Sequence, residues 1–413
     1  MGALIAIALA VLAAVPAYWM RLSGLGLPVE LATLLFGLSI VGAAFAISWA
    51  AEAAEHDVPR ALALIVVALL ALMPEFAVDI VFAYNAGQDP TFAPYAAANM
   101  TGSNRLLLGL GWPMVAVVAW TFSGRRLLTL DKGSALPLAF LAAATLYAFS
   151  LPLRAGIAPI DSLVLFALFI AYAVLAARQE AEEPELVGPA AAIGALPKLH
   201  RRLVVIALFA FAGLTIILSA ESFAEGLVHT GARLGIDEFL LVQWLAPLAS
   251  EAPEFLIAAL LAMRGKGSAG LALLLSGEVN QWLLLVGSLP LAYSISAGHL
   301  APLPLDQRQV GEVLLTASMS LFGVAVLASL SLALMEAALL AVLFVGQLVL
   351  GGILRAGLHS TDMASVGLGW FSLLYVLLSV VFLFAARPTL ARLLERARAD
   401  QSKPGDDKRA EFG

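Results

Sequence analysis

The sequence predicts an all-α polytopic membrane protein of about twelve transmembrane helices, an inverted repeat of two five-helix units with broken helices at the centre. Three observations support this prediction. Of the 413 residues, 62% are hydrophobic and only 13% are charged, which is more apolar than a soluble domain needs. Apolar runs long enough to cross a hydrocarbon core recur along the whole chain. The phrase Pro-Glu-Phe occurs twice, at Pro74–Phe76 and Pro253–Phe255.

The predicted spans are apolar runs of about 18–28 residues, the length that a helix needs to cross a ~30 Å hydrocarbon core. They cover residues 2–21, 28–52, 59–85, 92–122, 134–151, 160–178, 203–229, 237–264, 267–293, 310–330, 332–354 and 366–386. The first run contains a small-residue stretch, Ala14–Ala17, of the kind found at signal cleavage sites. No positively charged segment precedes it, so a retained helix is favoured over a cleaved signal.

These spans divide the chain into six parts. We predict an extra N-terminal transmembrane helix at 1–22, a first unit at 28–178, a cytoplasmic loop at 179–202, a second unit at 203–354, an extra C-terminal transmembrane helix at 366–386 and a cytoplasmic basic tail at 387–413. In the tail, leucines alternate with arginines. This pattern fits an amphipathic helix on the anionic inner leaflet or a plain solvated end.

The basic residues indicate the orientation. On the twelve-span prediction, 17 of the 23 Lys and Arg residues fall on one side of the membrane. Only Arg21, Arg154, Arg233, Arg308 and Arg355 fall on the other. The positive-inside rule then places both termini in the cytoplasm.

The two Pro-Glu-Phe phrases lie in longer matching segments. Glu52 and Glu55 precede the first phrase, and Glu221 and Glu225 precede the second, in each case near the end of the preceding span. Each phrase is followed by a polar segment and a leucine triplet. Matching the triplets aligns Ser103-Asn104 with Asn280-Gln281. Five spans separate the start of one unit from the start of the other, and an odd number inverts the second copy.

On these residues the chain resembles the cation/calcium exchanger superfamily, which includes sodium/calcium and proton/calcium antiporters. The resemblance rests on Pro74-Glu75 and Pro253-Glu254, on Asn99 with Gly102-Ser103-Asn104, and on the Glu221/Glu225 helix, and it covers about residues 28–354. It implies that each unit contains a broken helix with its neighbour, and that Glu75 and Glu254 jointly bind the cation.

The chain departs from the usual pattern of that family, so the resemblance is to a divergent member. The family usually has Gly-Thr-Ser before the Pro-Glu, where this chain has Leu70-Ala71-Leu72 and Ala249-Ser250-Glu251. A polar residue common after Gly-Ser-Asn in sodium/calcium exchangers is here Leu107, with Leu284 opposite. The ligand set therefore differs from that of a typical sodium/calcium exchanger.

The candidate cation ligands are carboxylates and amides in predicted spans. They are Glu75, Glu254, Glu251, Asp79, Glu278, Asn99, Asn104 and Asn280. Glu75 and Asp79 share a helix face, and so do Glu251 and Glu254. Such oxygens suit hard cations such as Ca²⁺, while the absence of cysteine and of clustered histidine argues against softer metals. The two asparagines at 99 and 104 could instead join helices by hydrogen bonds.

Two other charged residues in predicted spans are expected to be structural. Glu336 is expected to serve as a hydrogen-bonded packing element. Arg105 is expected to neutralise a nearby carboxylate, because an unpaired arginine in lipid is costly.

The leading function hypothesis is a secondary active antiporter that exchanges Ca²⁺, or a similar hard cation, for H⁺ or Na⁺ by alternating access. Crowded carboxylates offer a route to proton exchange. The alternatives are an antiporter for Na⁺, K⁺ or Mg²⁺ against H⁺, and a non-transporting sensor or scaffold. An enzyme is not expected, because the protease motifs of membrane enzymes are missing.

The same features predict the cofactors, the partners and the location of the protein. No cofactor is expected beyond the transported cation. The expected partners are inorganic cations and the lipid bilayer, and no nucleic acid is expected. The predicted location is a bacterial inner (plasma) membrane. The sequence makes no prediction of the oligomeric state.

Overall fold

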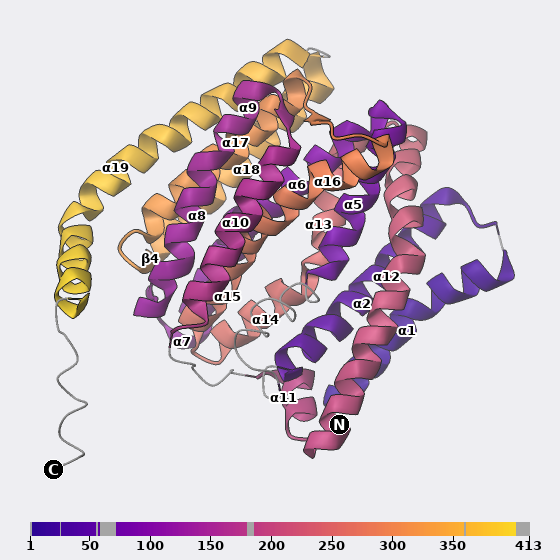
Figure 1. Ribbon diagram of the computed structural model, residues 1–413, viewed down its shortest axis with the longest axis horizontal. Coiled ribbons are helices and arrows are strands. Elements are labelled where there is room, and N and C mark those ends of the chain that lie inside the picture. The colour runs from indigo at the N-terminus through magenta and orange to yellow at the C-terminus, as the bar shows by residue number, and fades with distance from the viewer. Residues whose placement is uncertain are drawn as a thin grey trace.

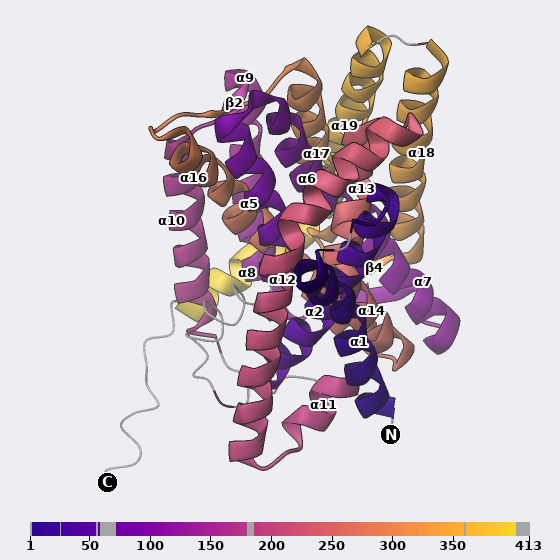
Figure 2. The same cartoon turned by 90° about the vertical axis from the view of Figure 1, so that its right-hand side faces the viewer.

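The computed structural model describes residues 2–24, 26–54, 57, 72–179, 186–358 and 361–401. In this part of the chain the protein is helical apart from two small antiparallel two-stranded sheets. The helices stand side by side, and the long helix α12 (Lys198–Leu234) crosses one flank of the bundle (Figures 1 and 2).

Within the described residues, the N-terminal half has two helices before residue 57 and the rest of its elements after residue 71. Its elements are α1 (Gly2–Ser23), α2 (Val29–Ala54), α5 (Met73–Gln88), η2 (Pro90–Phe92), α6 (Ala93–Leu106), η3 (Leu107–Gly111), α7 (Trp112–Ser123), β1 (Leu127–Thr129), η4 (Lys132–Ser134), α8 (Ala135–Ala148), α9 (Ser150–Arg154), β2 (Gly156–Ile157) and α10 (Pro159–Ala176).

The C-terminal half begins with a short helix and the long α12. Its elements are α11 (Gly188–Gly194), α12, α13 (Glu238–Ser250), α14 (Ala252–Met263), α15 (Gly267–Asn280), η5 (Gln281–Leu285), α16 (Val286–Ala297), β3 (Leu303–Pro304), α17 (Gln307–Leu327), β4 (Ser331–Ala333), α18 (Leu334–Leu358) and α19 (Thr361–Gln401).

The membrane-spanning character of the chain is confirmed. Within the described residues, nine helices are long and apolar enough to cross a membrane, or ten if the bent pair α13–α14 counts as one span. The predicted span 59–85 lies partly outside the described residues, and α18 is counted only as a shorter apolar helix. The total of twelve spans therefore stays a prediction.

Two helices are longer than the sequence predicted. Helix α12 begins at Lys198, inside the predicted cytoplasmic loop, and that loop also contains α11. Helix α19 contains the predicted last span and continues to Gln401, through part of the predicted tail. In both cases a polar or basic segment continues the helix beyond its apolar part.

Helices α1, α2 and α12 pack together on one side of the bundle (Figure 2). The Tyr18 and Thr215 hydroxyls lie 2.9 Å apart, and the Ser39 hydroxyl donates a hydrogen bond to the Ala13 carbonyl at 3.0 Å. Near the N-terminal end of α12, Arg201 donates a hydrogen bond to Asp57 at 2.7 Å. This hydrogen bond lowers the pKa of the Asp57 carboxyl below its usual value.

Two long helical segments have the same internal plan. The first consists of α6 with 14 residues, η3 with 5 and α7 with 12. The second consists of α15 with 14 residues, η5 with 5 and α16 with 12. In both, the middle piece is π-helical, and π-helical turns inside α-helices occur frequently at functional sites.

The two small sheets connect the two halves of the chain. Strand β1 pairs antiparallel with β4, and β2 pairs antiparallel with β3. Each sheet therefore joins one strand from the first half to one from the second. Ala155 before β2 and Leu330 before β4 both have positive φ, 48° and 55°. The recurrence of this strained conformation, rare outside glycine, at matching places supports an internal repeat.

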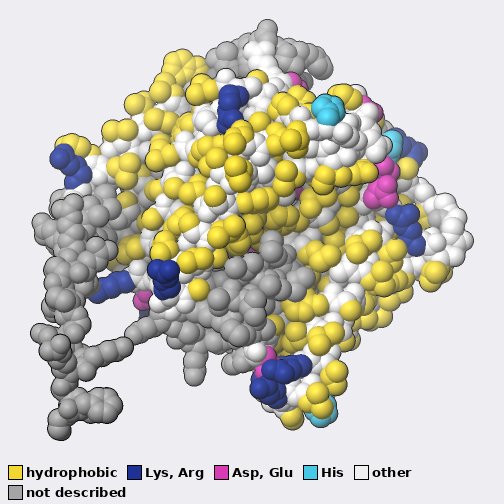
Figure 3. Space-filling model, in the orientation of Figure 1, with side chains coloured by type: hydrophobic (Ala, Val, Ile, Leu, Met, Phe, Trp, Pro, Cys, Tyr) yellow, Lys and Arg dark blue, Asp and Glu magenta, His cyan; other side chains and the backbone are white. Residues whose placement is uncertain are grey.

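The outer surface is apolar. The face in Figure 3 is covered mostly by hydrophobic side chains. Helix α10 contributes Leu163 and Ile170, which are 66% and 59% exposed. In a soluble monomer such a patch would be exceptional, whereas in a membrane protein it faces the lipid.

Candidate functional site

The two Pro-Glu-Phe phrases begin helices. Leu72 is the N-cap of α5 and Glu251 is the N-cap of α14, and in each helix the proline occupies the first turn. Proline is tolerated there because the amide hydrogens of the first turn have no partner within the helix. In the second half, α13 and α14 meet at a bend of 55°.

Each phrase also places a glutamate in the first turn of its helix, Glu75 in α5 and Glu254 in α14. The positive end of the helix dipole favours a negative charge at this position. The N-terminal ends of two helices, one from each half, thus present carboxylates.

Both carboxylates line one small cavity of about 20 Å³. Its lining residues are Leu72, Pro74, Glu75, Leu107, Ser250, Glu251, Glu254, Gly277 and Gln281. This volume holds about one water-sized particle. The structure therefore brings three of the predicted ligands, Glu75, Glu251 and Glu254, to a single place.

The cavity carboxylates have oxygens without hydrogen-bond partners in the described part of the chain. Glu75 is 4% exposed, and its Oε1 has no partner. Glu251 is 3% exposed; its Oε1 accepts a hydrogen bond from Gln281 Nε2 at 2.7 Å, and its Oε2 has none. Glu254 is partly exposed, and its Oε2 is also unpartnered. Buried oxygens of this kind require a proton, a cation or a water to satisfy them.

These three carboxylates do not form a complete metal site by themselves. Among the described residues, no group of three Asp, Glu, His or Cys side chains is placed to hold a metal ion. A cation here would need further oxygens, and Gln281 Oε1 is buried and unpartnered in the same part of the structure. The Ser103 hydroxyl also lies beside Glu75.

A second polar group lies one helical turn along α5. Asp79 and Asn99 are fully buried, and none of their side-chain oxygen or nitrogen atoms has a hydrogen-bond partner in the described structure. Asn99, from α6, lies beside Asp79. Neither residue lines the cavity, so these two predicted ligands adjoin it without reaching it.

The remaining predicted ligands lie elsewhere. Asn104 is fully buried and donates a hydrogen bond to the Met100 carbonyl at 2.9 Å. Glu278 is fully buried and accepts a hydrogen bond from the Ser320 hydroxyl at 2.8 Å. Asn280 is partly buried, and its neighbour Gln281 lines the cavity in its place.

Where the structure describes them, the paired glutamates near the ends of the spans before the two Pro-Glu-Phe phrases, and Glu336, lie outside the cavity lining. Glu221 is largely exposed, with Arg21 3.8 Å away. Glu336 accepts a hydrogen bond from the Ala333 amide at 2.7 Å, which confirms a structural role at the start of α18. Glu55 lies outside the described residues.

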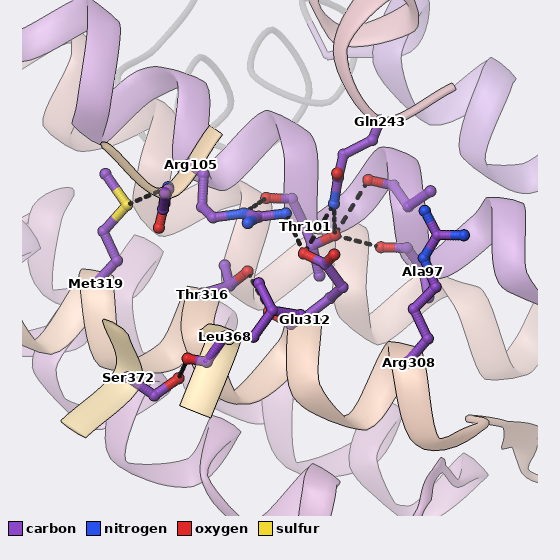
Figure 4. Close-up of polar contacts among 12 residues, drawn as sticks. Ala97, Thr101, Arg105, Gln243, Arg308, Glu312, Thr316, Met319, Leu368 and Ser372 are labelled. Carbon is purple, nitrogen blue, oxygen red and sulfur yellow. Dashed lines mark hydrogen bonds and ion pairs between the residues drawn. The ribbon is translucent and has the colours of Figure 1, made fainter. Parts of the chain in front are cut away.

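Arg105 pairs with a carboxylate, as expected, and its partner is Glu312 on α17 at 2.6 Å. Gln243 also donates a hydrogen bond to Glu312 (Figure 4). Glu312 and Gln243 were not among the predicted functional residues. Glu312 carried a signal, since an acidic residue inside a predicted span is itself a candidate for pairing.

The sodium/calcium exchanger protein family has a model that matches residues 29–178 and 204–351 of the chain. The solved structure of the H⁺/Ca²⁺ exchanger CAX is 44% identical in sequence, with 96% of this chain and 98% of that chain covered and a TM-score of 0.87. No curated protein sequence matches the chain.

Two further solved structures share the fold at low identity. Native YfkE is 14% identical, with 89% of this chain and 99% of that chain covered and a TM-score of 0.59. The sodium-calcium exchanger NCX_Mj is 18% identical, with 78% of this chain and 98% of that chain covered and a TM-score of 0.51.

Proposed function

The chain belongs to the sodium/calcium exchanger family, and from this premise we propose that it exchanges Ca²⁺ for H⁺ across the membrane, with the cation bound between Glu75 and Glu254. The resemblance to the cation/calcium exchanger superfamily is thereby confirmed, and the chain is a transporter. One observation carries the proposal: a single cavity is lined by carboxylates from both halves of the chain.

The proposed cation ligands are oxygens, as Ca²⁺ prefers. Glu75 and Glu254 are the central ligands, and Glu251 and Gln281 supply further oxygens from the same cavity. The other candidates are proposed to tune the site from nearby. They are Asp79, Glu278, Asn99, Asn104 and Asn280.

The proposed counter-ion is the proton. Glu251 lies close enough to Glu75 and Glu254 for their negative charges to repel one another. Leaving all three ionised in an empty, buried cavity is costly, since each intramembrane charge costs ~3 kcal/mol. Protons that bind when Ca²⁺ leaves would neutralise them. The related CAX structure is of an H⁺/Ca²⁺ exchanger, which supports the same choice.

We propose a bacterial inner membrane as the location, with both termini cytoplasmic. The excess of Lys and Arg on one predicted side supports this orientation. Alternating access is proposed to occur between the two units 28–178 and 203–354. Their bounds nearly coincide with the two segments that the family model matches, 29–178 and 204–351.

The test is ⁴⁵Ca²⁺ flux in proteoliposomes under imposed pH and Na⁺ gradients. A pH gradient should drive uptake of Ca²⁺, and Glu254→Gln should reduce it by at least about 100-fold because one central ligand is lost. The matched control is Glu336→Gln, which changes a glutamate that caps α18 outside the cavity. Full flux in Glu254→Gln would contradict the site, and flux driven only by Na⁺ would contradict the counter-ion.

A further inference from the structure

A buried ion pair lies on the opposite side of α6 from the carboxylates of α5. Arg105 Nη2 donates a hydrogen bond to Glu312 Oε2 at 2.6 Å, and the two side chains are 2% and 1% exposed. Arg105 Nε also donates to the Thr101 carbonyl at 3.1 Å. The guanidinium lies 5.0 Å from the ring centroid of Trp244, a favourable cation–π distance. The arginine is therefore held from three directions.

Gln243 connects this pair to a third helix. Its Nε2 donates to Glu312 Oε2 at 3.1 Å and to the Thr101 hydroxyl at 3.3 Å (Figure 4). Thr101 and Arg105 belong to α6, Gln243 to α13 and Glu312 to α17. We refer to these four residues as the α6 clamp. It joins a helix of the first unit to two helices of the second.

The clamp and the candidate site use opposite faces of α6. Thr101 and Arg105 are four residues apart and share one face, and Asn99 and Ser103 share another in the same way. The two sets differ by two positions, a rotation of about 200° at 3.6 residues per turn. Asn99 lies beside Asp79, and Ser103 lies beside Glu75. A rotation of α6 would therefore move these polar groups relative to the α5 carboxylates.

The clamp also includes a residue of α13, the helix that ends next to Glu251. Gln243 precedes Glu251 by two helical turns, about 12 Å along α13. A Cβ atom added to Gly102 of α6 would overlap the backbone carbonyl of Gln243. The two helices therefore touch backbone to backbone beside the clamp.

The opposite half of the molecule has an apolar residue at the matching place. Aligning the starts of the two π-helical segments pairs Arg105 of α6 with Val279 of α15. This differs by three residues from the alignment of the leucine triplets, which pairs Arg105 with Trp282. Val279 is fully buried among hydrophobic residues of the core. An arginine at this position is therefore present in α6 and absent from α15, so the clamp belongs to only one of the two matching segments.

We infer that Arg105 is a positioning residue for cation binding, which acts through Glu312 and Gln243 to fix the rotation of α6 and its distance from α13. The inference rests on the proposed function. Removing the clamp is expected to weaken cation binding more than it slows turnover, because the ligands remain present and only their placement changes.

The experiment compares ⁴⁵Ca²⁺ flux kinetics of the full chain in proteoliposomes with those of the double variant Arg105→Leu/Glu312→Leu. Replacing both members of a buried ion pair by apolar residues commonly preserves stability, whereas removing one strands the other charge. We expect a melting temperature close to that of the unmodified protein and a KM for Ca²⁺ raised about tenfold. The maximal rate should change by less than about threefold. Arg105→Lys, which keeps the charge, should give an intermediate KM.

The control is Arg154→Leu/Asp161→Leu, which removes another arginine–carboxylate pair, at 2.7 Å between α9 and α10. Its arginine is half-exposed, and Asp161 also accepts hydrogen bonds from the Tyr147 hydroxyl and the Ala158 amide. The KM of this control variant should not change. The inference is overturned if the KM for Ca²⁺ is unchanged in the clamp variant, or if it rises equally in the control. In either case, normal flux in the unmodified protein leaves the proposed function intact. If the double variant does not fold, the KM for Ca²⁺ is measured in Gln243→Leu instead. It should be raised, and an unchanged value overturns the inference. Absence of flux in the unmodified protein overturns both proposals.

Discussion

Gln281 shows how a single residue of the site escaped prediction. The leucine triplets indicate Asn280 and its neighbour, and the predicted ligand is Asn280. In the structure Gln281 is the first residue of the π-helical η5 and lines the cavity. The starts of η3 and η5 pair Gln281 with Leu107, and both residues line the cavity. The leucine triplets pair Leu107 with Leu284 instead, so that alignment is displaced by three residues and misses the pairing with Gln281.

The Gln281→Leu variant tests the role of this amide. It removes the donor to Glu251 and an oxygen beside the cavity. We expect the KM for Ca²⁺ in the flux assay to rise at least about tenfold, since a buried carboxylate oxygen loses its partner. Gln347→Leu is the control, because Gln347 is also a buried glutamine but does not line the cavity. Equal KM values in the two variants would contradict this role.

For the other site residues, the repeated Pro-Glu-Phe phrase was the most informative pattern in the sequence. Glu75, Glu251 and Glu254 lie on one cavity, in agreement with a site shared by two halves. Asp79 and Asn99 lie beside it, and Glu278 turns instead toward Ser320. Spacing along a helix shows which residues share a face. It does not show which neighbouring helix that face meets, and this is why the positions of Asp79 and Glu278 needed the structure.

At the scale of the elements, the close contact of α6 with α13 depends on the absence of a side chain at Gly102. A Cβ atom there would overlap the Gln243 carbonyl oxygen, and small residues permit such backbone contacts between membrane helices. Gly102→Ala should therefore separate the helices, lower the melting temperature by several degrees and raise the KM for Ca²⁺, since overpacking costs about 1–3 kcal/mol.

Gly213→Ala is the control for this prediction. A Cβ atom at Gly213 would meet the Met73 side chain at 3.6 Å, an ordinary contact. Alanine also has the higher helix propensity, so this variant should melt at or above the temperature of the unmodified protein. Equal melting temperatures for the two variants, measured by tryptophan fluorescence, would show that the α6–α13 contact is not tight.

At the scale of the whole molecule, the orientation in the membrane can be tested directly because the chain contains no cysteine. Arg125 follows α7 and His299 follows α16, and both are exposed. In intact cells, a membrane-impermeant maleimide should label His299→Cys and not Arg125→Cys. Everted vesicles should give the reverse. Labelling of both positions from the same side would contradict the predicted topology.

Most of the fold class was predictable because lipid imposes a simple rule: a spanning segment is apolar and helical. The apolar runs therefore identified the spans from α1 to α19 that the structure describes. The break between α13 and α14 agrees with the broken helix predicted for the second unit, although its angle of 55° was not predictable. The two π-helical segments were not predicted, because π-helical turns depend on packing that no local pattern encodes.

The two small sheets have a consequence for biogenesis. Strand β1 pairs with β4, and β2 with β3, so each sheet needs a strand that is synthesised far later than its partner. Neither sheet can form until the second half of the chain has entered the membrane. The strands of the first half therefore stay without their partners until the second half has been made, so completing these sheets is a late event in assembly.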